Sequence, residues 1–190
     1  MNIGITGKFL SGKTTFSKLL AEELAWDLFS CDAYVEELYK INSVRKIIID
    51  TFGENVYKDN SIQKKVLSGI VFDSKENLEK LESIIIPLVE AEIKKRINYN
   101  SKTVFEIPLL YEKQLQHLMD VCILMVCSAK TCMTRTKLRN FSEEDYLKRS
   151  SRFLSDEEKE NLGALVVVNE GSLEKLKSEA KRIAGLIRGL

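Results

Sequence analysis

Short apolar runs alternate along the chain with longer stretches in which apolar residues recur every three or four positions. The runs, which have the length of β-strands, lie at residues 2–6, 28–31, 103–107, 121–126 and 165–168. The run at 121–126 is almost wholly apolar, as a strand buried on both faces should be. The longer stretches, which have the spacing of amphipathic helices, are residues 14–25, 33–39, 63–72, 75–97, 129–138 and 173–187. Residues 43–52 fit either a helix or a strand, and Pro87 is expected to interrupt the helix that contains it.

Strands that alternate with helices predict an α/β fold with a five-stranded parallel sheet and helices on both faces. With 190 residues, the chain suits a single domain, residues 1–190, that has room for a small inserted subdomain. The helical stretch from about residue 60 to residue 97 is the candidate for that insertion.

Charge, hydrophobic patterning and cysteine content limit the expected binding partners and the expected compartment. The net charge of +1 gives the chain no overall attraction to nucleic acid or membranes, so neither is expected as a partner. No apolar run of transmembrane length and no secretory leader pattern is present, which favours the cytoplasm. The cysteines Cys31, Cys122, Cys127 and Cys132 form no C-x-x-C pair, so we expect reduced, buried side chains rather than a metal site.

One segment matches a phosphate-binding motif, G-x-x-x-x-G-K-[ST], between the first strand and the first helix. Its residues are Gly7, Lys8, Phe9, Leu10, Ser11, Gly12, Lys13 and Thr14. The two glycines let the backbone N–H groups wrap a phosphate, and Lys13 reaches the β and γ phosphates of ATP. The Thr14 hydroxyl is a Mg²⁺ ligand in such loops. Together with Thr15, the loop is therefore the predicted ATP site, and an ordinary glycine-rich turn is the weaker interpretation.

Basic residues gather between positions 130 and 152, where the sequence has seven basic and three acidic side chains. Arg135 and Arg139, four positions apart, share one face of a predicted helix. Arginines brought over the transferring phosphoryl group stabilise its charge, so residues of about 135–153 are the candidate lid. A solvated basic face is the alternative.

Two carboxylates follow predicted strands at the edge where parallel α/β sheets bind ligands. Asp32 comes just after the second strand and is the candidate base that takes the proton of an acceptor hydroxyl. Its alternative role is that of an N-cap for the helix that begins at Ala33. Glu106 ends the third strand, where an acid is able to hold a Mg²⁺-bound water, or it is simply a buried, hydrogen-bonded strand residue.

The motifs together resemble the dephospho-coenzyme A kinase family over nearly the whole chain. The matching segments are Gly4–Thr14, Asp32, Asp59–Ile62, Ile86–Val89, Glu106–Glu112, Arg135, Arg139 and Val166–Gly171. The segment Pro108-Leu109-Leu110-Tyr111-Glu112 is the most specific to that family. The family usually has glycine where Lys8 and Leu10 stand, and glutamine where Phe153 stands.

The resemblance implies a lid, a helical acceptor-binding subdomain, and transfer of the γ-phosphate of ATP to the ribose 3′-hydroxyl of dephospho-coenzyme A. It implies that Asp32 is the catalytic base, with Lys13 and Arg139 stabilising the transferred group, and that Asn169 lies beside the adenine. Residues expected to bind the acceptor are Asp32, Lys64, Pro108, Leu109, Glu112 and Arg149. ATP is the expected co-substrate, Mg²⁺ the cofactor, and a small molecule the partner.

Other functions remain open from the sequence. One is a kinase of the same fold that acts on a nucleoside or nucleotide. Another is a GTP-binding switch, since residues 50–53 match D-x-x-G and residues 128–130 read Ser-Ala-Lys, although the [NT]-K-x-D segment that reads guanine is missing. A third is a nucleotide-binding module without turnover.

Overall fold

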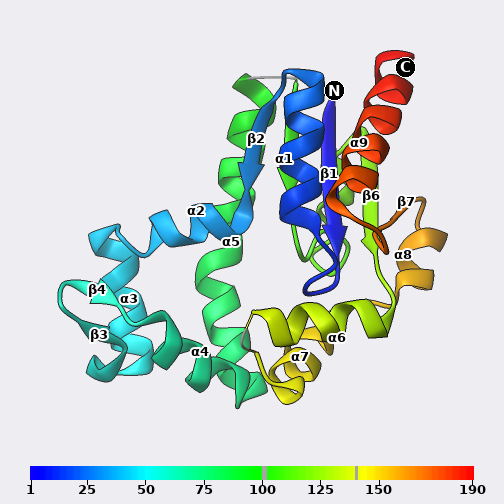
Figure 1. Ribbon diagram of the computed structural model, residues 1–190. Helices are drawn as coiled ribbons and strands as arrows, with labels where there is room; N and C mark the ends of the chain where they lie inside the picture. Colours follow the sequence, from blue (N-terminus) through cyan, green and yellow to red (C-terminus); the bar gives the residue numbers. More distant parts are fainter. Residues whose placement is uncertain (100–101, 140) are drawn as a thin grey trace. The chain divides into compact units, whose positions relative to one another are not determined.

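The computed structural model describes residues 1–99, 102–139 and 141–190 (Figure 1). The chain divides into two compact units, of which the first comprises Met1–Ser30 with Arg96–Leu190 and the second Cys31–Lys95. The second unit thus begins at Cys31, well before the expected start of an insertion near residue 60. Two helices that precede residue 60 bury apolar side chains within this unit, which explains the earlier boundary.

A five-stranded sheet forms the centre of the first unit. Its strands are β1 (Asn2–Gly7), β2 (Asp27–Ser30), β5 (Thr103–Glu106), β6 (Val121–Val126) and β7 (Leu165–Val168). They lie in the order β2-β5-β1-β6-β7, and every neighbouring pair is parallel. All six residues of β1 are buried, as expected for a central strand covered on both faces. The predicted fold class is confirmed.

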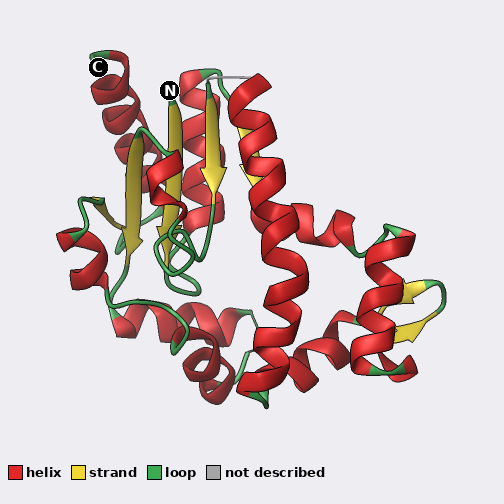
Figure 2. Cartoon of the chain, turned by 180° about the vertical axis from the view of Figure 1, so that it is seen from behind, coloured by secondary structure: helices red, strands yellow, loops and turns green. Residues whose placement is uncertain are grey.

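Helices α1 (Lys13–Leu24) and α9 (Leu173–Arg188) contact each other and pack on one face of this sheet (Figures 1 and 2). Their apolar faces join Ile3 and Ile5 of β1 in a single buried core. The intervening residue, Gly4, points to the opposite face, where a Cβ would lie 2.8 Å from Met119 and 2.9 Å from Leu110. The segment after β5, including the short 3₁₀ turn η2 (Leu115–Leu118), therefore covers that face closely.

Three shorter helices complete the first unit: α6 (Ala129–Leu138), α7 (Glu143–Ser150) and α8 (Asp156–Asn161). Ser155 and Glu158 form the reciprocal hydrogen bonds of a capping box at the start of α8. The candidate lid, residues 135–153, spans the end of α6 and all of α7; Asn140 within it lies outside the described residues.

The second unit is built mainly of helices: α2 (Cys31–Leu38), α3 (Asn42–Phe52), the 3₁₀ turn η1 (Glu54–Val56), α4 (Lys64–Phe72) and most of α5 (Lys75–Tyr99). A small antiparallel hairpin, β3 (Tyr57–Lys58) with β4 (Ser61–Ile62), stands between η1 and α4. Asp59 and Asn60 form its turn with φ angles of 50° and 59°, a conformation that these two residue types tolerate well. The ambiguous residues 43–52 are a helix.

Helix α5 runs through Pro87 without a break, so the expected interruption is wrong. Ile85 and Val89 are buried on one side of the helix, which holds the two halves in line through packing. Pro87 itself is exposed, and water is able to reach the carbonyl group that the missing N–H leaves unpaired.

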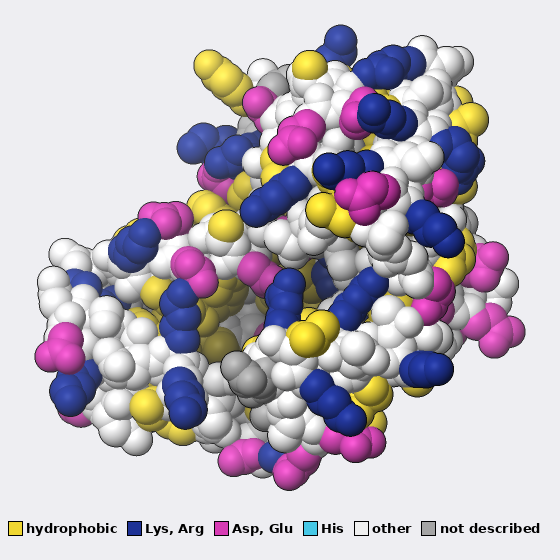
Figure 3. All heavy atoms as spheres, viewed as in Figure 1, with side chains coloured by type: hydrophobic (Ala, Val, Ile, Leu, Met, Phe, Trp, Pro, Cys, Tyr) yellow, Lys and Arg dark blue, Asp and Glu magenta, His cyan; other side chains and the backbone are white. Residues whose placement is uncertain are grey.

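Figure 3 shows basic and acidic side chains interspersed over the visible face, in keeping with the balanced net charge. Within the described part of the chain, none of the helices combines the length and the apolar character that crossing a membrane requires.

Candidate active site

The phosphate-loop motif forms a tight connection between β1 and α1. Gly7, at φ 146°, has no room for a side chain, because a Cβ would lie 2.3 Å from the carbonyl oxygen of Met125. Gly12, at φ 99°, caps α1, and its Cβ would lie 2.1 Å from the side-chain nitrogen of Asn169. Both motif glycines are thus required by the close approach of neighbouring backbone and side chains.

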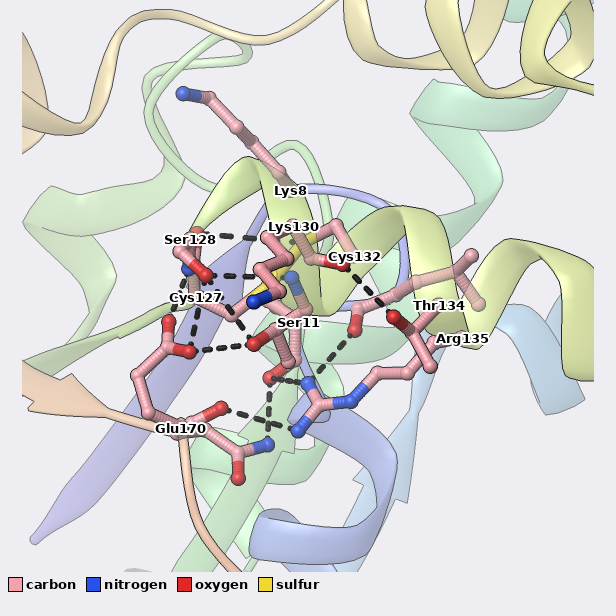
Figure 4. The surroundings of a disulfide bond; sticks show 12 residues. Lys8, Ser11, Cys127, Ser128, Lys130, Cys132, Thr134, Arg135 and Glu170 are labelled. Carbon is pink, nitrogen blue, oxygen red and sulfur yellow. Dashed lines mark hydrogen bonds between the residues drawn. A yellow bond between two sulfur atoms is a disulfide. The ribbon is translucent and has the colours of Figure 1, made fainter.

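Two polar side chains hold the carbonyl groups of this loop. Arg135 on α6 donates from Nη1 to the carbonyl oxygens of Leu10 (3.0 Å) and Ser11 (3.2 Å), as Figure 4 shows. Its Nη2 atom donates to the carbonyl oxygen of Asn169 at 3.0 Å, and the Asn169 amide donates to Ser11 at 2.8 Å. The guanidinium group that we expected over the phosphates therefore binds the backbone of the loop itself.

Glu170 fastens the segment after β7 to the first turn of α6. Its carboxylate accepts hydrogen bonds from the Ser128 backbone N–H, from the Ser128 hydroxyl at 3.0 Å and from the Thr131 hydroxyl at 2.5 Å (Figure 4). These bonds, that of Thr131 foremost, hold the pKa of Glu170 below its usual range. No pattern in the sequence pairs Glu170 with Ser128, which lies 42 positions earlier in the chain.

A disulfide joins Cys127, directly after β6, to Cys132 in α6 (Figure 4). The expectation that all the cysteines are reduced is wrong for this pair. Helix α6 begins at Ala129, and its first turn brings Cys132 back toward Cys127, with the two Cα atoms 6.4 Å apart. Cys31 is buried and Cys122 half-buried, and each keeps its thiol.

Thr14, in the first turn of α1, meets Glu106, the last residue of β5. The Thr14 hydroxyl donates to the Glu106 carboxylate at 2.5 Å, although 92 residues separate them in the chain. Glu106 is 2% exposed, which matches the sequence alternative of a buried, hydrogen-bonded strand residue. The described residues include no group of three or more histidine, cysteine, aspartate or glutamate side chains suited to a metal ion. Hard oxygen ligands of this kind, one carboxylate and one hydroxyl, nevertheless fit Mg²⁺, which usually takes its remaining ligands from phosphates and water.

Lys13 is 9% exposed and lies over the loop that precedes it. Its Nζ atom donates to the carbonyl oxygen of Lys8 at 2.9 Å and lies 5.9 Å from the centre of the Phe153 ring. Lys8 in turn forms an ion pair with Asp156 at 3.1 Å. The segment that follows α7 is thereby attached to the loop at two points.

A cleft of about 420 Å³ opens beside Asn169. It is lined by residues 168–171, from the last residue of β7 onward, and by Lys175, Leu176, Ser178 and Glu179 on α9. The space adjoins the residue that holds the Ser11 carbonyl, so a molecule in it lies next to the phosphate loop.

The expected acceptor-binding residues divide between the two units. Asp32 and Lys64 belong to the second unit, and Lys64, at the start of α4, forms an ion pair with Glu36 that lowers the pKa of that carboxyl. Asp32 is exposed and is the second residue of α2, so the alternative that it caps a helix beginning at Ala33 is wrong.

The remaining members of that set lie in the first unit. Pro108 accepts a hydrogen bond from the Thr6 hydroxyl at 2.8 Å, and Leu109 is half-buried. The Arg149 guanidinium lies over the rings of Phe9 (5.3 Å) and Phe141 (5.2 Å). Arg139, at the end of α6, is exposed.

Glu112, another member, is part of a buried ion pair. Its carboxylate lies 2.8 Å from Nζ of Lys159, which is 0% exposed, and it also accepts from the Leu154 backbone N–H. Lys159 was not predictable from the sequence, because a lysine in the acidic segment 156–160 is typical of a solvated helix.

The residues that matched GTP-switch motifs do not lie where a guanine-nucleotide site requires them. Asp50 lies inside α3, whereas a D-x-x-G switch follows a strand of the nucleotide-binding sheet. Ser128 is the N-cap of α6 and is bound to Glu170. The geometry therefore does not support a guanine-binding site at these segments.

Comparisons of the sequence with known proteins point to one family. The family model described as dephospho-CoA kinase matches residues 1–175. A dephospho-CoA kinase of Fusobacterium nucleatum is 31% identical, with 98% of each chain covered. That of Aquifex aeolicus is 32% identical over 95% of this chain and 94% of its own.

The fold is also similar to that of solved kinases. A solved dephospho-CoA kinase from Campylobacter jejuni superposes with a TM-score of 0.69 over 98% of this chain and 96% of its own, at 22% identity. Because the family model and these relatives span nearly the whole sequence, the chain belongs to the dephospho-coenzyme A kinase family.

Proposed function

We infer that this site performs the reaction of the family, the ATP-dependent conversion of dephospho-coenzyme A to coenzyme A. The observation that carries the inference is the loop between β1 and α1, in which the Lys13 ammonium lies against the Lys8 carbonyl and the next residue, Thr14, donates to Glu106. A lysine and a buried acid at the rim of a glycine-dependent loop are the elements that phosphoryl transfer from ATP requires.

On the donor side, we propose that the backbone N–H groups of Gly7–Thr14 bind the phosphates of ATP. Lys13 leaves the Lys8 carbonyl and turns its charge to the γ-phosphate, while Arg139 joins it from the lid. Thr14 and Glu106 would hold Mg²⁺, which neutralises charge on the phosphates. The cleft beside Asn169 has room for the adenine.

On the acceptor side, Asp32 is the proposed base. The ribose 3′-hydroxyl oxygen forms a bond to the γ-phosphorus, the bond from that phosphorus to the ADP oxygen breaks, and the hydroxyl proton passes to the Asp32 carboxylate. Asp32 is exposed in the first turn of α2. Lys64, Pro108, Leu109, Glu112 and Arg149 are the proposed acceptor contacts, although Glu112 supports them through Lys159 and Leu154.

We place the enzyme in the cytoplasm, where ATP is available, and expect a small-molecule acceptor rather than nucleic acid. A kinase of the same fold with a nucleoside or nucleotide acceptor is the remaining alternative.

The experiment is a competition among acceptors. Equal concentrations of dephospho-coenzyme A, adenosine, AMP, CMP and UMP are supplied with limiting ATP, and the products are read by mass. We expect dephospho-coenzyme A to be phosphorylated with the highest kcat/KM, and Lys13→Ala to lower turnover by about 10² or more. A higher kcat/KM for a nucleoside or nucleotide overturns the acceptor, and near-normal turnover of Lys13→Ala overturns the role of the loop.

A further inference from the structure

The Glu112–Lys159 ion pair fixes the backbone just after Phe153. The Lys159 side chain is 0% exposed and that of Glu112 10%, and their charged atoms are 2.8 Å apart. The same Glu112 oxygen accepts a hydrogen bond from the backbone N–H of Leu154 at 2.8 Å. A buried pair that is also hydrogen-bonded to backbone holds its neighbours in one arrangement, because separating the charges leaves each without compensation.

The ring of Phe153 lies close to two ammonium groups. Lys159 Nζ is 5.0 Å from the ring centre, and Lys13 Nζ is 5.9 Å from it. Both distances are within the range at which the negative face of an aromatic ring attracts a cation. Since Lys159 is fixed by Glu112, the position of the ring is fixed as well.

An aromatic face is a suitable neighbour for a lysine that must bind phosphate. A carboxylate at this place would compete with the nucleotide for the Lys13 ammonium, whereas the attraction of a ring is weaker than that of a phosphate. The ring also covers the ammonium with apolar surface and limits the orientations of its long side chain. Lys13 is therefore held near the loop and is still able to turn to a ligand.

A second contact attaches the same segment to the loop, since Asp156 forms an ion pair with Lys8 at 3.1 Å. Lys8 and Phe153 are both positions at which the sequence differs from the usual residues of the family. The two differences thus meet in one structural feature, a short segment from Phe153 to Asp156 that is joined to the phosphate loop at Lys8 and Lys13.

We propose that Phe153 is a positioning residue for Lys13: its ring, held by the Glu112–Lys159 pair, orients the ammonium group before the phosphates of ATP bind. This proposal rests on the proposed function, because it requires that Lys13 bind the nucleotide phosphates. Phe153 itself is not a catalytic residue.

The test compares Phe153→Leu with Phe153→Tyr, which keeps the ring face. Binding of ATP and of adenosine is measured by titration calorimetry, and unfolding is followed in parallel. We expect Phe153→Leu to weaken ATP binding by about twofold to thirtyfold and to leave adenosine binding unchanged. Phe153→Tyr should restore ATP affinity to within about twofold of the wild type.

A double-mutant cycle separates positioning from general loss of structure. In a Lys13→Met background the Phe153→Leu change should have no further effect on ATP binding, because the ammonium group is gone. An equal effect in both backgrounds overturns the proposal, as does equal ATP affinity of Phe153→Leu and wild type. If Phe153→Leu fails to fold, Phe153→Met provides a second flexible, non-aromatic side chain for the same cycle.

The same binding measurements distinguish the role of Phe153 from that of the phosphate loop. If Lys13→Met binds ATP as tightly as the wild type, the assignment of the phosphate loop is wrong. If Lys13→Met weakens ATP binding and Phe153→Leu does not, the loop assignment stands and only the role of Phe153 falls.

Discussion

The Arg135 guanidinium donates a hydrogen bond of 3.0 Å to the carbonyl oxygen of Leu10, and thereby joins α6 to the phosphate loop. Further bonds from the same group reach Ser11 and Asn169. Leu10, with φ at 65°, has a left-handed backbone that non-glycine residues seldom adopt. The arginine thus stabilises the loop at its least favourable residue.

Replacing Arg135 by lysine should lower the free energy of unfolding by about 1–3 kcal/mol. A lysine keeps the charge but cannot direct several N–H groups at three carbonyl oxygens, so buried acceptors lose their partners. Chemical denaturation measures the change. Arg139→Lys, at the exposed end of the same helix, is the matched control and should alter stability by less than about 0.5 kcal/mol. Equal effects of the two substitutions would mean that the bonds from Arg135 do not stabilise the loop.

At position 10, alanine should be more destabilising than glycine, by about 1 kcal/mol. Both substitutions remove a side chain that is 9% exposed, and each loses its buried apolar surface. Alanine retains the strain of the left-handed conformation, which glycine relieves. Urea unfolding of Leu10→Ala and Leu10→Gly measures the difference. As a control, alanine and glycine are placed at Lys18, an exposed helical residue, where the alanine variant should be the more stable of the two. A lower stability for Leu10→Gly than for Leu10→Ala would show that the φ angle does not control stability at position 10.

Asp32→Asn should lower kcat by about 10²–10⁴ and leave the free energy of unfolding within about 1 kcal/mol of the wild type. The amide has no basic oxygen for the acceptor proton, while the loss of one charge in the first turn of α2 costs little. Glu37→Gln, an exposed acid on the same helix, is the control and should retain full turnover. Unchanged kcat in Asp32→Asn refutes the assignment of the base.

Removing the Cys127–Cys132 disulfide by a double serine substitution should lower the free energy of unfolding by about 2 kcal/mol. The bond closes a short loop, with a sequence separation of 5, so it restricts the unfolded chain only modestly. A reducing agent should destabilise the wild type by the same amount and leave the double variant unchanged. Thiol titration of the unreduced, denatured chain should find the two thiols of Cys31 and Cys122. A count of four thiols would contradict the presence of the bond.

The sheet and the phosphate loop were predictable because their signals are local. Each of the five strands is a short segment with two or more apolar residues, and the loop has fixed residue types at fixed spacing. The partners of those residues were not predictable. Arg135 binds Leu10 across 125 positions and Glu170 binds Ser128 across 42, and no pattern along the chain pairs such positions.

Burial of charge was also hidden in the sequence. Lys159 lies in the run Asp-Glu-Glu-Lys-Glu, which indicates an exposed helix, yet its side chain is fully buried against Glu112. The hairpin at residues 57–62 was missed because its strands have two residues each, too few for an alternating pattern. Both the burial of Lys159 and the hairpin depend on contacts that form only when the chain folds.

The order of the strands also bears on how the enzyme is made. β1 occupies the middle of the sheet, but its partner residues begin at Thr103 on one side and Val121 on the other. At a synthesis rate of about 5–20 residues per second, the ribosome takes on the order of 5–20 s to make the first of these partners. During that interval the apolar first strand has no native neighbour in the sheet. Because its apolar side chains then stay exposed, we expect chaperones to bind it. The nascent chain therefore acquires its nucleotide loop late, although the residues of the loop are synthesised early.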